Sequence, residues 1–460
     1  MYDLVIIGGG AAGFAAATRA NDLGAKTLMV NAGLPIGGTC VNVGCVPSKH
    51  LLAIADALHS RRSSHFSSVP TAETPLPSFS AAKREKDELV ATLRQRNYLD
   101  VLGALEHVEF RPGRATIVGP GRIRVGDDEV EGRHILIATG ARAAIPPIPG
   151  LREAGFLTNV EALELEEAPR RLAVIGGGPL GLEFAQIFAR FGSEVTVIEA
   201  APEVVPRAEP EIAAVLREAL QAEGIRIVTG VRIESVRPGP PHRIRCADDL
   251  WVEAEAILVA TGIRPNTEGL GVEAAGGQLD ERGFVKAAAW YEAGHRLWAA
   301  GDVVGRMPLE TVAAKEGALA ASNALEGRRD AIDYDTVPWA VFTSPQLAGV
   351  GLTEAESMAR TRYCNCRTVF FSQLPRAIAA KDTVGAIKLT VDRGGRIRGG
   401  YACGTNAAEI IHEVALAVRF RLTVHDIIDA VHVFPTYSEA VKLAAHAFTR
   451  DISVMTCCIG

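Results

Sequence analysis

The sequence lacks the features that would assign it to several large classes of protein. No apolar run approaches the ~20 residues that a membrane-spanning helix needs. The 48 basic and 54 acidic residues give a formal net charge of −6, which does not favour a general nucleic-acid binder. With 48% hydrophobic and 22% charged residues, the chain is not disordered, collagen-like or a coiled coil. A basic, apolar leader is also missing from the start. We therefore expect a soluble, cytoplasmic protein that binds neither membrane nor nucleic acid.

Two segments repeat one pattern, in which a buried strand is followed by a glycine-rich turn, a helix and a second strand. They are residues 2–31 and 172–199. Both turns have the spacing G-x-G-x-x-G, which lets the backbone approach a pyrophosphate that the helix N-terminus then holds. One such match can be an ordinary tight turn, but two in the correct context predict two dinucleotide sites.

Each repeat is followed by a similar predicted strand. Residues 135–140 and 257–262 both read Ile-Leu-x-Ala-Thr-Gly, and each is expected to leave a nucleotide domain at its final glycine. Farther on, Asp302 follows the predicted strand 297–301, at a position where open α/β sheets place ligand contacts. A turn residue or helix cap is the alternative for Asp302, and taken alone it is favoured.

The pattern changes after Tyr334. Residues 339–351, 387–391 and 399–403 are typical of an antiparallel sheet, and residues 407–420, 424–430 and 439–448 of helices. Residues 60–80, rich in Ser and Pro, are predicted to form a surface loop. A chain of 460 residues is too long to form a single hydrophobic core. The change of pattern therefore predicts a third, α+β domain.

Cys40 and Cys45 are the strongest chemical signal. A five-residue step on an ideal helix rises about 7.5 Å, which is beyond usual disulfide separations. Gly44 and Pro47 therefore indicate a distorted or starting helix that could bring the sulfurs together. A helix start with Lys49 nearby favours a thiolate, so a redox-active pair is favoured over two inert cysteines.

In this order the motifs resemble the flavin-dependent pyridine nucleotide–disulfide oxidoreductases over essentially the whole chain. The resemblance implies an α/β fold with two Rossmann-like dinucleotide-binding domains and a C-terminal α+β dimerisation domain. The expected domains are residues 1–147 with 264–335 for FAD, 148–263 for NAD(P)H, and 336–460 for the interface. A homodimer with active sites shared between subunits is implied as well.

The resemblance also assigns roles to single residues. Cys45 is expected to contact the flavin, Cys40 to face the substrate, and Lys49 to pair with Glu183 beside the flavin's reactive edge, although Glu183 alone could be a helix-surface acid. The implied FAD contacts are Gly8, Gly10, Gly13, Asn31, Gly38, Thr39, Thr139, Gly140, Gly301 and Asp302. The implied NAD(P)H contacts are Gly176, Gly178, Gly181, Glu199 and Gly262.

The residue that ends the second strand of each repeat normally accepts a hydrogen bond from the ribose. Glu199 favours a free 2′-hydroxyl and so predicts a preference for NADH, with NADPH possible because Arg207 lies nearby in sequence. In the FAD repeat this residue is Asn31 rather than the family's usual Glu, and Asn can still hydrogen-bond a hydroxyl.

Disulfide-reducing members of the family carry His-Pro-Thr-x-Ser-Glu near the C-terminus, where the His is the acid–base. Here Phe434 occupies the His position and Glu439 remains. Phenylalanine cannot transfer a proton, so exchange with an organic disulfide loses its base. His432 could act as a substitute, but a satisfied surface histidine is favoured.

Cys457 and Cys458 lie two residues before the end of the chain. Adjacent cysteines bridge only across a distorted peptide, whereas two thiols on a tail suit a soft metal ion. An incidental pair is the alternative. Together with Phe434, this tail resembles the mercuric-ion-reducing branch of the family. That branch implies Hg(II) delivered as a thiol complex, captured by Cys457 and Cys458, and reduced at Cys40 and Cys45, with Tyr437 near the metal.

Two other functions stay open. One is a disulfide reductase of the dihydrolipoamide dehydrogenase or glutathione reductase kind, and the other is a non-catalytic, metal-sequestering flavoprotein. Cys246 and Cys403 match no motif. Cys364 and Cys366 could be an accessory thiol pair, but incidental cysteines at a strand edge are favoured.

Overall fold

The computed structural model describes residues 1–64, 66–71 and 77–455, which form two compact units. Unit 1 comprises residues 1–50, 83–144 and 262–332, and unit 2 comprises 51–82, 145–261 and 333–460. Cys457 and Cys458 lie outside the described residues. Among the helices described, none is long and apolar enough to span a membrane. The three-domain boundaries expected from the sequence stay a prediction.

Unit 1 is built on an eight-stranded sheet. Its main path runs in the order β16 (Glu292–Gly294), β17 (Leu297–Ala299), β6 (Asp128–Ile137), β1 (Tyr2–Ile7), β2 (Thr27–Asn31) and β3 (Val108–Pro112). All neighbours on this path are parallel except β16 and β17. The antiparallel strands β4 (Ala115–Gly119) and β5 (Arg122–Val125) join it through β6.

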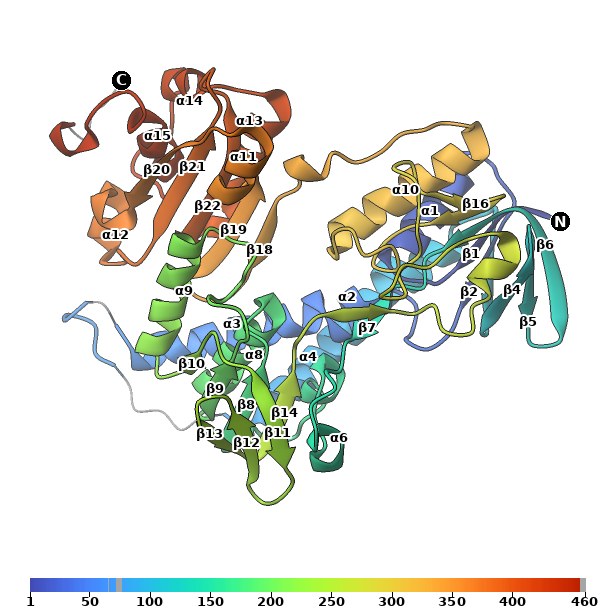
Figure 1. Ribbon diagram of the computed structural model, residues 1–460, viewed down its shortest axis with the longest axis horizontal. Coiled ribbons are helices and arrows are strands. Elements are labelled where there is room, and N and C mark those ends of the chain that lie inside the picture. The colour runs from blue at the N-terminus through green and yellow to red at the C-terminus, as the bar shows by residue number, and fades with distance from the viewer. Residues whose placement is uncertain (65, 72–76, 456–460) are drawn as a thin grey trace. The chain divides into compact units, whose positions relative to one another are not determined.

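The alternation of side chains along β1 explains how this sheet is covered. Leu4 and Ile6 are buried in one core, with alanines of α1 (Ala11–Asp22) and α10 (Glu310–Glu326). Val5 and Ile7 point to the other face and pack in a second core with residues of β4 and β5. α1 and α10 lie side by side (Figure 1), so closely that a Cβ on Gly317 would lie 1.9 Å from the Ala12 carbonyl oxygen.

Unit 2 contains the second nucleotide repeat. Its parallel sheet has the order β10 (Arg226–Val228), β9 (Glu194–Ile198), β8 (Arg171–Ile175) and β14 (Ala256–Val259). Helix α8 (Pro179–Arg190) follows β8, and α9 (Pro210–Ala222) follows β9. A separate antiparallel sheet consists of β11 (Ile233–Arg237), β12 (His242–Cys246) and β13 (Trp251–Ala254). The βαβ arrangement predicted for both repeats is confirmed.

The C-terminal part of unit 2 is the predicted α+β fold. Its five-stranded antiparallel sheet has the order β18 (Trp339–Val341), β19 (Gln346–Gly351), β22 (Ile397–Gly404), β21 (Ala386–Val391) and β20 (Asn365–Phe370). It shares one core with residues of α12 (Pro375–Ala380), α13 (Ala407–Phe420), α14 (Val424–Asp429) and α15 (Glu439–His446). Residues 339–351 form two strands rather than one, and β20 was not predicted.

Two of the remaining helices overlap the ends of the surface loop predicted for residues 60–80. That loop is shorter than expected, because α3 (Cys45–Arg62) ends after residue 60 and α4 (Phe79–Arg94) begins before residue 80. The remaining short helices are α5 (Asp100–Gly103), α6 (Leu151–Ala154), α7 (Asn159–Ala162) and α11 (Glu354–Thr361). One further antiparallel strand pair consists of β7 (Ala141–Ala143) and β15 (Ile263–Pro265).

The two glycine-rich turns have the same backbone contacts. A Cβ on Gly13 would lie 1.9 Å from the Gly8 carbonyl oxygen, and one on Gly181 would lie 2.0 Å from that of Gly176. Gly8 has a φ of +119° and Gly176 a φ of +111°, which only glycine adopts readily. Each turn therefore requires glycine at its first and third fingerprint positions.

These contacts predict that two substitutions in the same turn differ strongly in their effect on stability. Gly13→Ala should lower the free energy of unfolding by about 2–4 kcal/mol, because its Cβ meets backbone that cannot move aside. Gly10→Ala should change it by less than about 0.5 kcal/mol, because Gly10 has a φ of −85° and its Cβ would meet nothing closer than 3.7 Å. Urea denaturation of the ligand-free variants measures both, and equal losses would contradict the account.

Candidate active site

Cys40 and Cys45, both in unit 1, lie on either side of a break between two helices. Helix α2 (Gly38–Val43) carries Cys40, and Cys45 is the first residue of the 18-residue helix α3. Gly44 between them has φ −132° and ψ −113°, which interrupts the helix as its position in the sequence predicts. Both cysteines are free thiols, joined by a side-chain hydrogen bond.

The two sulfurs have different surroundings. The hydrogen bond with Cys45, followed by burial, raises the pKa of Cys40 far above its ordinary value. Cys45 is exposed and lies at a helix N-terminus, where the helix dipole favours a thiolate. The arrangement therefore favours Cys40 as a protonated member of the pair.

Two further residues near Cys40 were not predicted. Tyr98, in the short π-helical segment Gln95–Leu99, packs edge-on against Phe14 with ring centroids 5.1 Å apart. Burial, followed by the electrostatic influence of Cys40, raises the pKa of Tyr98 to about 12, so it stays a neutral hydroxyl. The carboxylate of Glu310 also contributes to raising the Cys40 pKa. Neither residue belongs to a sequence motif that could have identified it.

Asn42 fixes the loop that precedes the cysteines. Its side-chain amide donates to the carbonyl oxygens of Pro35, Ile36 and Gly38, at 3.1, 3.2 and 2.8 Å, and its oxygen accepts from Arg94 at 3.1 Å. Asn42 therefore acts as a positioning residue for the glycines that open α2.

The first glycine-rich turn fits an anionic dinucleotide. Gly10 caps α1 without any side-chain hydrogen bond and no acid occupies the first turn, so the helix N-terminus is available to a phosphate. Gly10 also approaches Gly38 so closely that a Cβ on Gly38 would lie 2.7 Å from the Gly10 Cα. The Thr139 hydroxyl is buried and has no hydrogen-bond partner among the described residues, which is what a group reserved for a ligand would show.

The strand-end residues of both repeats hold their turns in the same way. Asn31 accepts from the Gly9 amide at 3.0 Å and donates to the Leu34 carbonyl at 3.0 Å. Glu199 accepts from the amides of Gly177 and Ala201 at 2.6 and 2.7 Å. Each side chain therefore lies at the turn, as the ribose contact requires. α8 begins at Gly178, again without a side-chain cap, so the second turn fits a dinucleotide as well.

Arg207 is engaged elsewhere in unit 2. Its guanidinium stacks on the Trp339 ring, 4.6 Å from the centroid, and burial lowers its pKa. Sequence proximity suggested Arg207 as a partner for a 2′-phosphate, and the stacking gives it a different role.

Gly301 and Asp302 follow β17, as predicted. Gly301 has a φ of +81°, and its amide donates to the buried Glu316 at 2.6 Å, a support that the sequence did not indicate. Burial raises the pKa of the Asp302 carboxyl to about 6. A partly desolvated carboxylate of this kind can accept hydrogen bonds from ligand hydroxyls.

Glu183 lies on α8 with 4% of its surface exposed. One carboxylate oxygen accepts from the Phe342 amide at 3.0 Å. The alternative of a helix-surface acid is therefore wrong, because this carboxylate is buried. Lys49, on α3, donates to the Ser48 hydroxyl at 3.4 Å. Lys49 belongs to unit 1 and Glu183 to unit 2, and their pairing stays a prediction.

The segment that carries the acid–base in disulfide reductases has no such group at its expected position. Phe434 is half-exposed, and Glu439 accepts from the Thr436 amide at 3.1 Å. His432 has both ring nitrogens occupied, one by the Ala430 carbonyl at 3.1 Å and the other by Glu413 at 2.8 Å. These contacts favour the satisfied histidine over the substitute base.

Tyr437 lies in the core of unit 2. Its ring packs against Phe371, with centroids 5.7 Å apart, and its hydroxyl donates to Asp382 at 2.9 Å. Burial and this hydrogen bond raise the pKa of Tyr437 to about 12. The contacts give Tyr437 a structural role, and its place near a metal stays a prediction.

Asp302 generates a prediction of pH dependence. Its pKa in the folded protein is about 6, against an ordinary value of 3.8. Between these values the native protein keeps a proton that the unfolded chain has lost, so stability falls as pH rises through this window. Asp302→Asn removes that loss and should stabilise the apoprotein by about 1–3 kcal/mol at pH 8 but not at pH 4.

Urea denaturation of the apoprotein across pH 4–8 checks the Asp302 effect. The exposed Asp127 of the same unit offers a matched control, Asp127→Asn. A stability difference that is the same at pH 4 and pH 8 would contradict a raised pKa at Asp302.

Comparison with known proteins agrees with this geometry. Residues 2–317 match the pyridine nucleotide-disulphide oxidoreductase family, and residues 337–445 match the dimerisation domain of that family. The chain is 40% identical to mercuric reductase of Streptomyces lividans over 471 residues, which cover 100% of this chain and 98% of the relative. It is 38% identical to dihydrolipoyl dehydrogenase of Thermus scotoductus over 466 residues, with 98% of each chain covered.

A solved structure is also similar. The HOCl-induced flavoprotein disulfide reductase of Escherichia coli, in its Cu(II) complex, superposes with a TM-score of 0.85 at 29% identity, over 97% of this chain and 99% of that one. These matches confirm the predicted fold, the FAD and NAD(P)H cofactors and the dimerisation domain that supports a homodimer. The chain therefore belongs to the pyridine nucleotide–disulphide oxidoreductase family, and within it resembles the mercuric reductases.

Proposed function

We propose that this enzyme reduces Hg(II) to Hg(0) with electrons from NAD(P)H. The observation that carries the proposal is Phe434, which stands where disulfide-reducing relatives place their acid–base histidine. Reduction of an organic disulfide has to deliver protons to the departing thiolates. Reduction of Hg(II) to the neutral metal consumes two electrons and no proton, so it tolerates phenylalanine.

The cysteine pair suits this substrate. Two thiols at the junction of α2 and α3 offer soft ligands, which hold a soft cation more tightly than carboxylates or amines do. When Hg(II) binds, Cys40 gives up its proton and both sulfurs become metal-bound thiolates. Because the pKa of Cys40 is raised, its thiolate is a stronger base and therefore a better donor to the metal.

Delivery of the metal is assigned to the tail. In the proposal, Hg(II) arrives as a thiol complex and exchanges onto Cys457 and Cys458 of the partner subunit. It then exchanges onto Cys40 and Cys45, with one sulfur–mercury bond forming as another breaks. FAD, when bound, accepts hydride from NAD(P)H and supplies electrons at the Cys45 side of the pair. Two electrons then convert the mercury dithiolate into Hg(0) and two thiolates.

A disulfide reductase of the dihydrolipoyl dehydrogenase kind is the second candidate. The 38% identity to such an enzyme favours it, and the His432–Glu413 pair near Phe434 could replace the missing base. That function would require His432 to release a ring nitrogen from its present partners.

Anaerobic titration separates the candidates. The holoenzyme is reduced with NADH, and flavin absorbance is followed after addition of Hg(II) as a dithiolate complex, of lipoamide or of oxidised glutathione. Mercury reduction predicts repeated reoxidation of the flavin by Hg(II) and little reoxidation by either disulfide. The reverse pattern would establish the disulfide reductase, and binding of Hg(II) without reoxidation of the flavin would identify a metal-sequestering flavoprotein.

The tail generates a direct prediction. Replacing Cys457 and Cys458 together with Ala should leave FAD content and NADH-to-flavin transfer intact. Turnover of dithiolate-bound Hg(II) should fall at least about 10-fold, because a two-thiol ligand is displaced readily by another thiolate pair. Turnover of weakly complexed Hg(II) should fall less, since this form can reach Cys40 and Cys45 directly. Unchanged turnover of the dithiolate complex would remove the capture role.

Glu199 predicts the nucleotide preference. Its carboxylate is held at the end of β9 by two backbone amides, where it would bond a ribose hydroxyl and repel a 2′-phosphate. The kcat/KM for NADH should exceed that for NADPH by about 10–100-fold, or ~1–3 kcal/mol. Glu199→Gln should lower this ratio, mainly by raising the kcat/KM for NADPH. Equal use of both nucleotides by the unchanged enzyme would contradict the assignment.

A further inference from the structure

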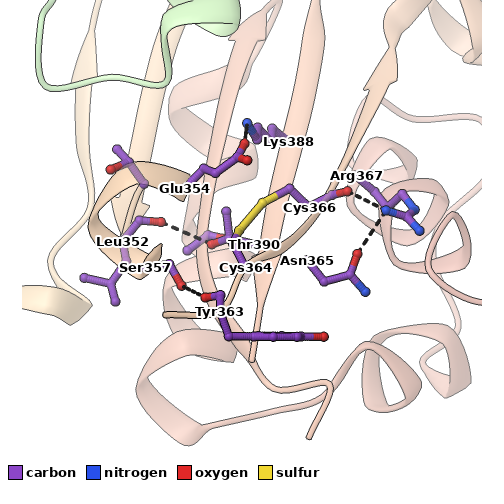
Figure 2. The surroundings of a disulfide bond; sticks show 12 residues. Leu352, Glu354, Ser357, Tyr363, Cys364, Asn365, Cys366, Arg367, Lys388 and Thr390 are labelled. Carbon is purple, nitrogen blue, oxygen red and sulfur yellow. Dashed lines mark hydrogen bonds and ion pairs between the residues drawn. A yellow bond between two sulfur atoms is a disulfide. The ribbon is translucent and has the colours of Figure 1, made fainter. Parts of the chain in front are cut away.

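Cys364 and Cys366 form a disulfide in unit 2, outside the site described above. Cys364 precedes β20 and Cys366 is its second residue, and their Cα atoms are 6.2 Å apart. The sequence favoured two incidental cysteines, but the structure joins them (Figure 2). Both are partly exposed, in contrast to Cys246 and Cys403, which are fully buried.

A carboxylate lies next to this pair. The two sulfur atoms and a carboxylate oxygen of Glu354 all lie within 4.8 Å of one another. Glu354 is the first residue of α11, directly after the capping residue Thr353. Figure 2 shows its side chain beside the disulfide. Three potential ligands of one metal ion thus converge from two elements.

A lysine lies beside the same cluster. Lys388 Nζ is 2.7 Å from Glu354 Oε2 and 3.2 Å from Glu209, and its side chain is almost completely buried. On the sheet, Lys388 pairs with Thr368 and Cys366 pairs with Thr390, so Lys388 and Cys366 point to the same face. Lys388 is also paired with Glu211 at 3.3 Å, and its contact with Glu354 holds that carboxylate beside the two sulfurs.

The bridge contributes little as a covalent staple. Its cysteines are only two residues apart, and the stabilisation expected from chain entropy falls with the length of the closed loop. Partly exposed disulfides are also the ones that thiols attack most readily. Its accessibility and its neighbouring carboxylate fit a reversible pair better than a structural one.

We propose that Cys364, Cys366 and Glu354 form a second, redox-gated site for a soft metal cation, independent of Cys40 and Cys45 and of mercury turnover. In the oxidised form the sulfurs are bonded to each other and bind no metal. Two equivalents of a small thiol donate two electrons and two protons, break the sulfur–sulfur bond and leave as one disulfide. The two thiols then bind one cation, such as Hg(II), and release two protons, while Glu354 supplies an oxygen ligand.

The test uses the full chain without the four cysteines of the proposed mercury pathway. Cys40, Cys45, Cys457 and Cys458 are replaced with Ala, and FAD content confirms that this background variant folds. It is titrated anaerobically with Hg(II) as its complex with free cysteine, before and after reduction by excess monothiol. Metal bound per chain is counted by native mass spectrometry, and thiols are counted by alkylation.

Reduction should expose two thiols and create one Hg(II) site per chain. Adding Cys364→Ser and Cys366→Ser should abolish that site, whereas Asn365→Ala, which keeps all three ligands, should retain it. Glu354→Gln should weaken binding about 10-fold. A reduced background variant that binds no more Hg(II) than the serine variant would overturn the metal site, and one full equivalent bound before reduction would overturn the redox gate.

Discussion

The close backbone contact between the first and third glycines of each fingerprint is the constraint on which the rest of the structure depends. In both units the helix can approach the end of its strand only because the third glycine has no Cβ. Each helix N-terminus lies at the turn and has no side-chain cap, and a pyrophosphate would bind there. The strand-end residues Asn31 and Glu199 then hold the turns through backbone amides. The predicted positions of both nucleotides therefore depend on the same kind of backbone contact.

A second break in regular structure creates the chemistry. Because Gly44 ends α2, Cys45 begins a new helix within hydrogen-bonding reach of Cys40. The hydrogen bond between the sulfurs and burial then raise the pKa of Cys40. At the position where disulfide-reducing relatives place their acid–base histidine, this chain has Phe434. A strongly basic thiol pair without an accompanying acid suits a cation better than it suits an organic disulfide.

The sequence predicted most of the fold and the parts of the site that depend on motifs. Both glycine-rich turns, the Gly44 break and Asp302 could be found because local backbone geometry requires particular residue types in a fixed order. The contacts of Tyr98 and the Cys364–Cys366 bridge could not. They depend on tertiary placement, through a π-helical segment and an edge strand that carry no local signal. Similarly, the strong pattern around residue 437 did not reveal that the core would enclose the tyrosine.

The central claim is that the electrons of NAD(P)H end on mercury. The most direct measurement is the yield of volatile Hg(0) per NADH oxidised, made anaerobically with the purified holoenzyme and thiol-bound Hg(II). The account predicts one Hg(0) for each NADH over many turnovers, and no Hg(0) when Cys40 and Cys45 are both replaced. NADH oxidation that depends on lipoamide or glutathione disulfide and releases no Hg(0) would contradict it.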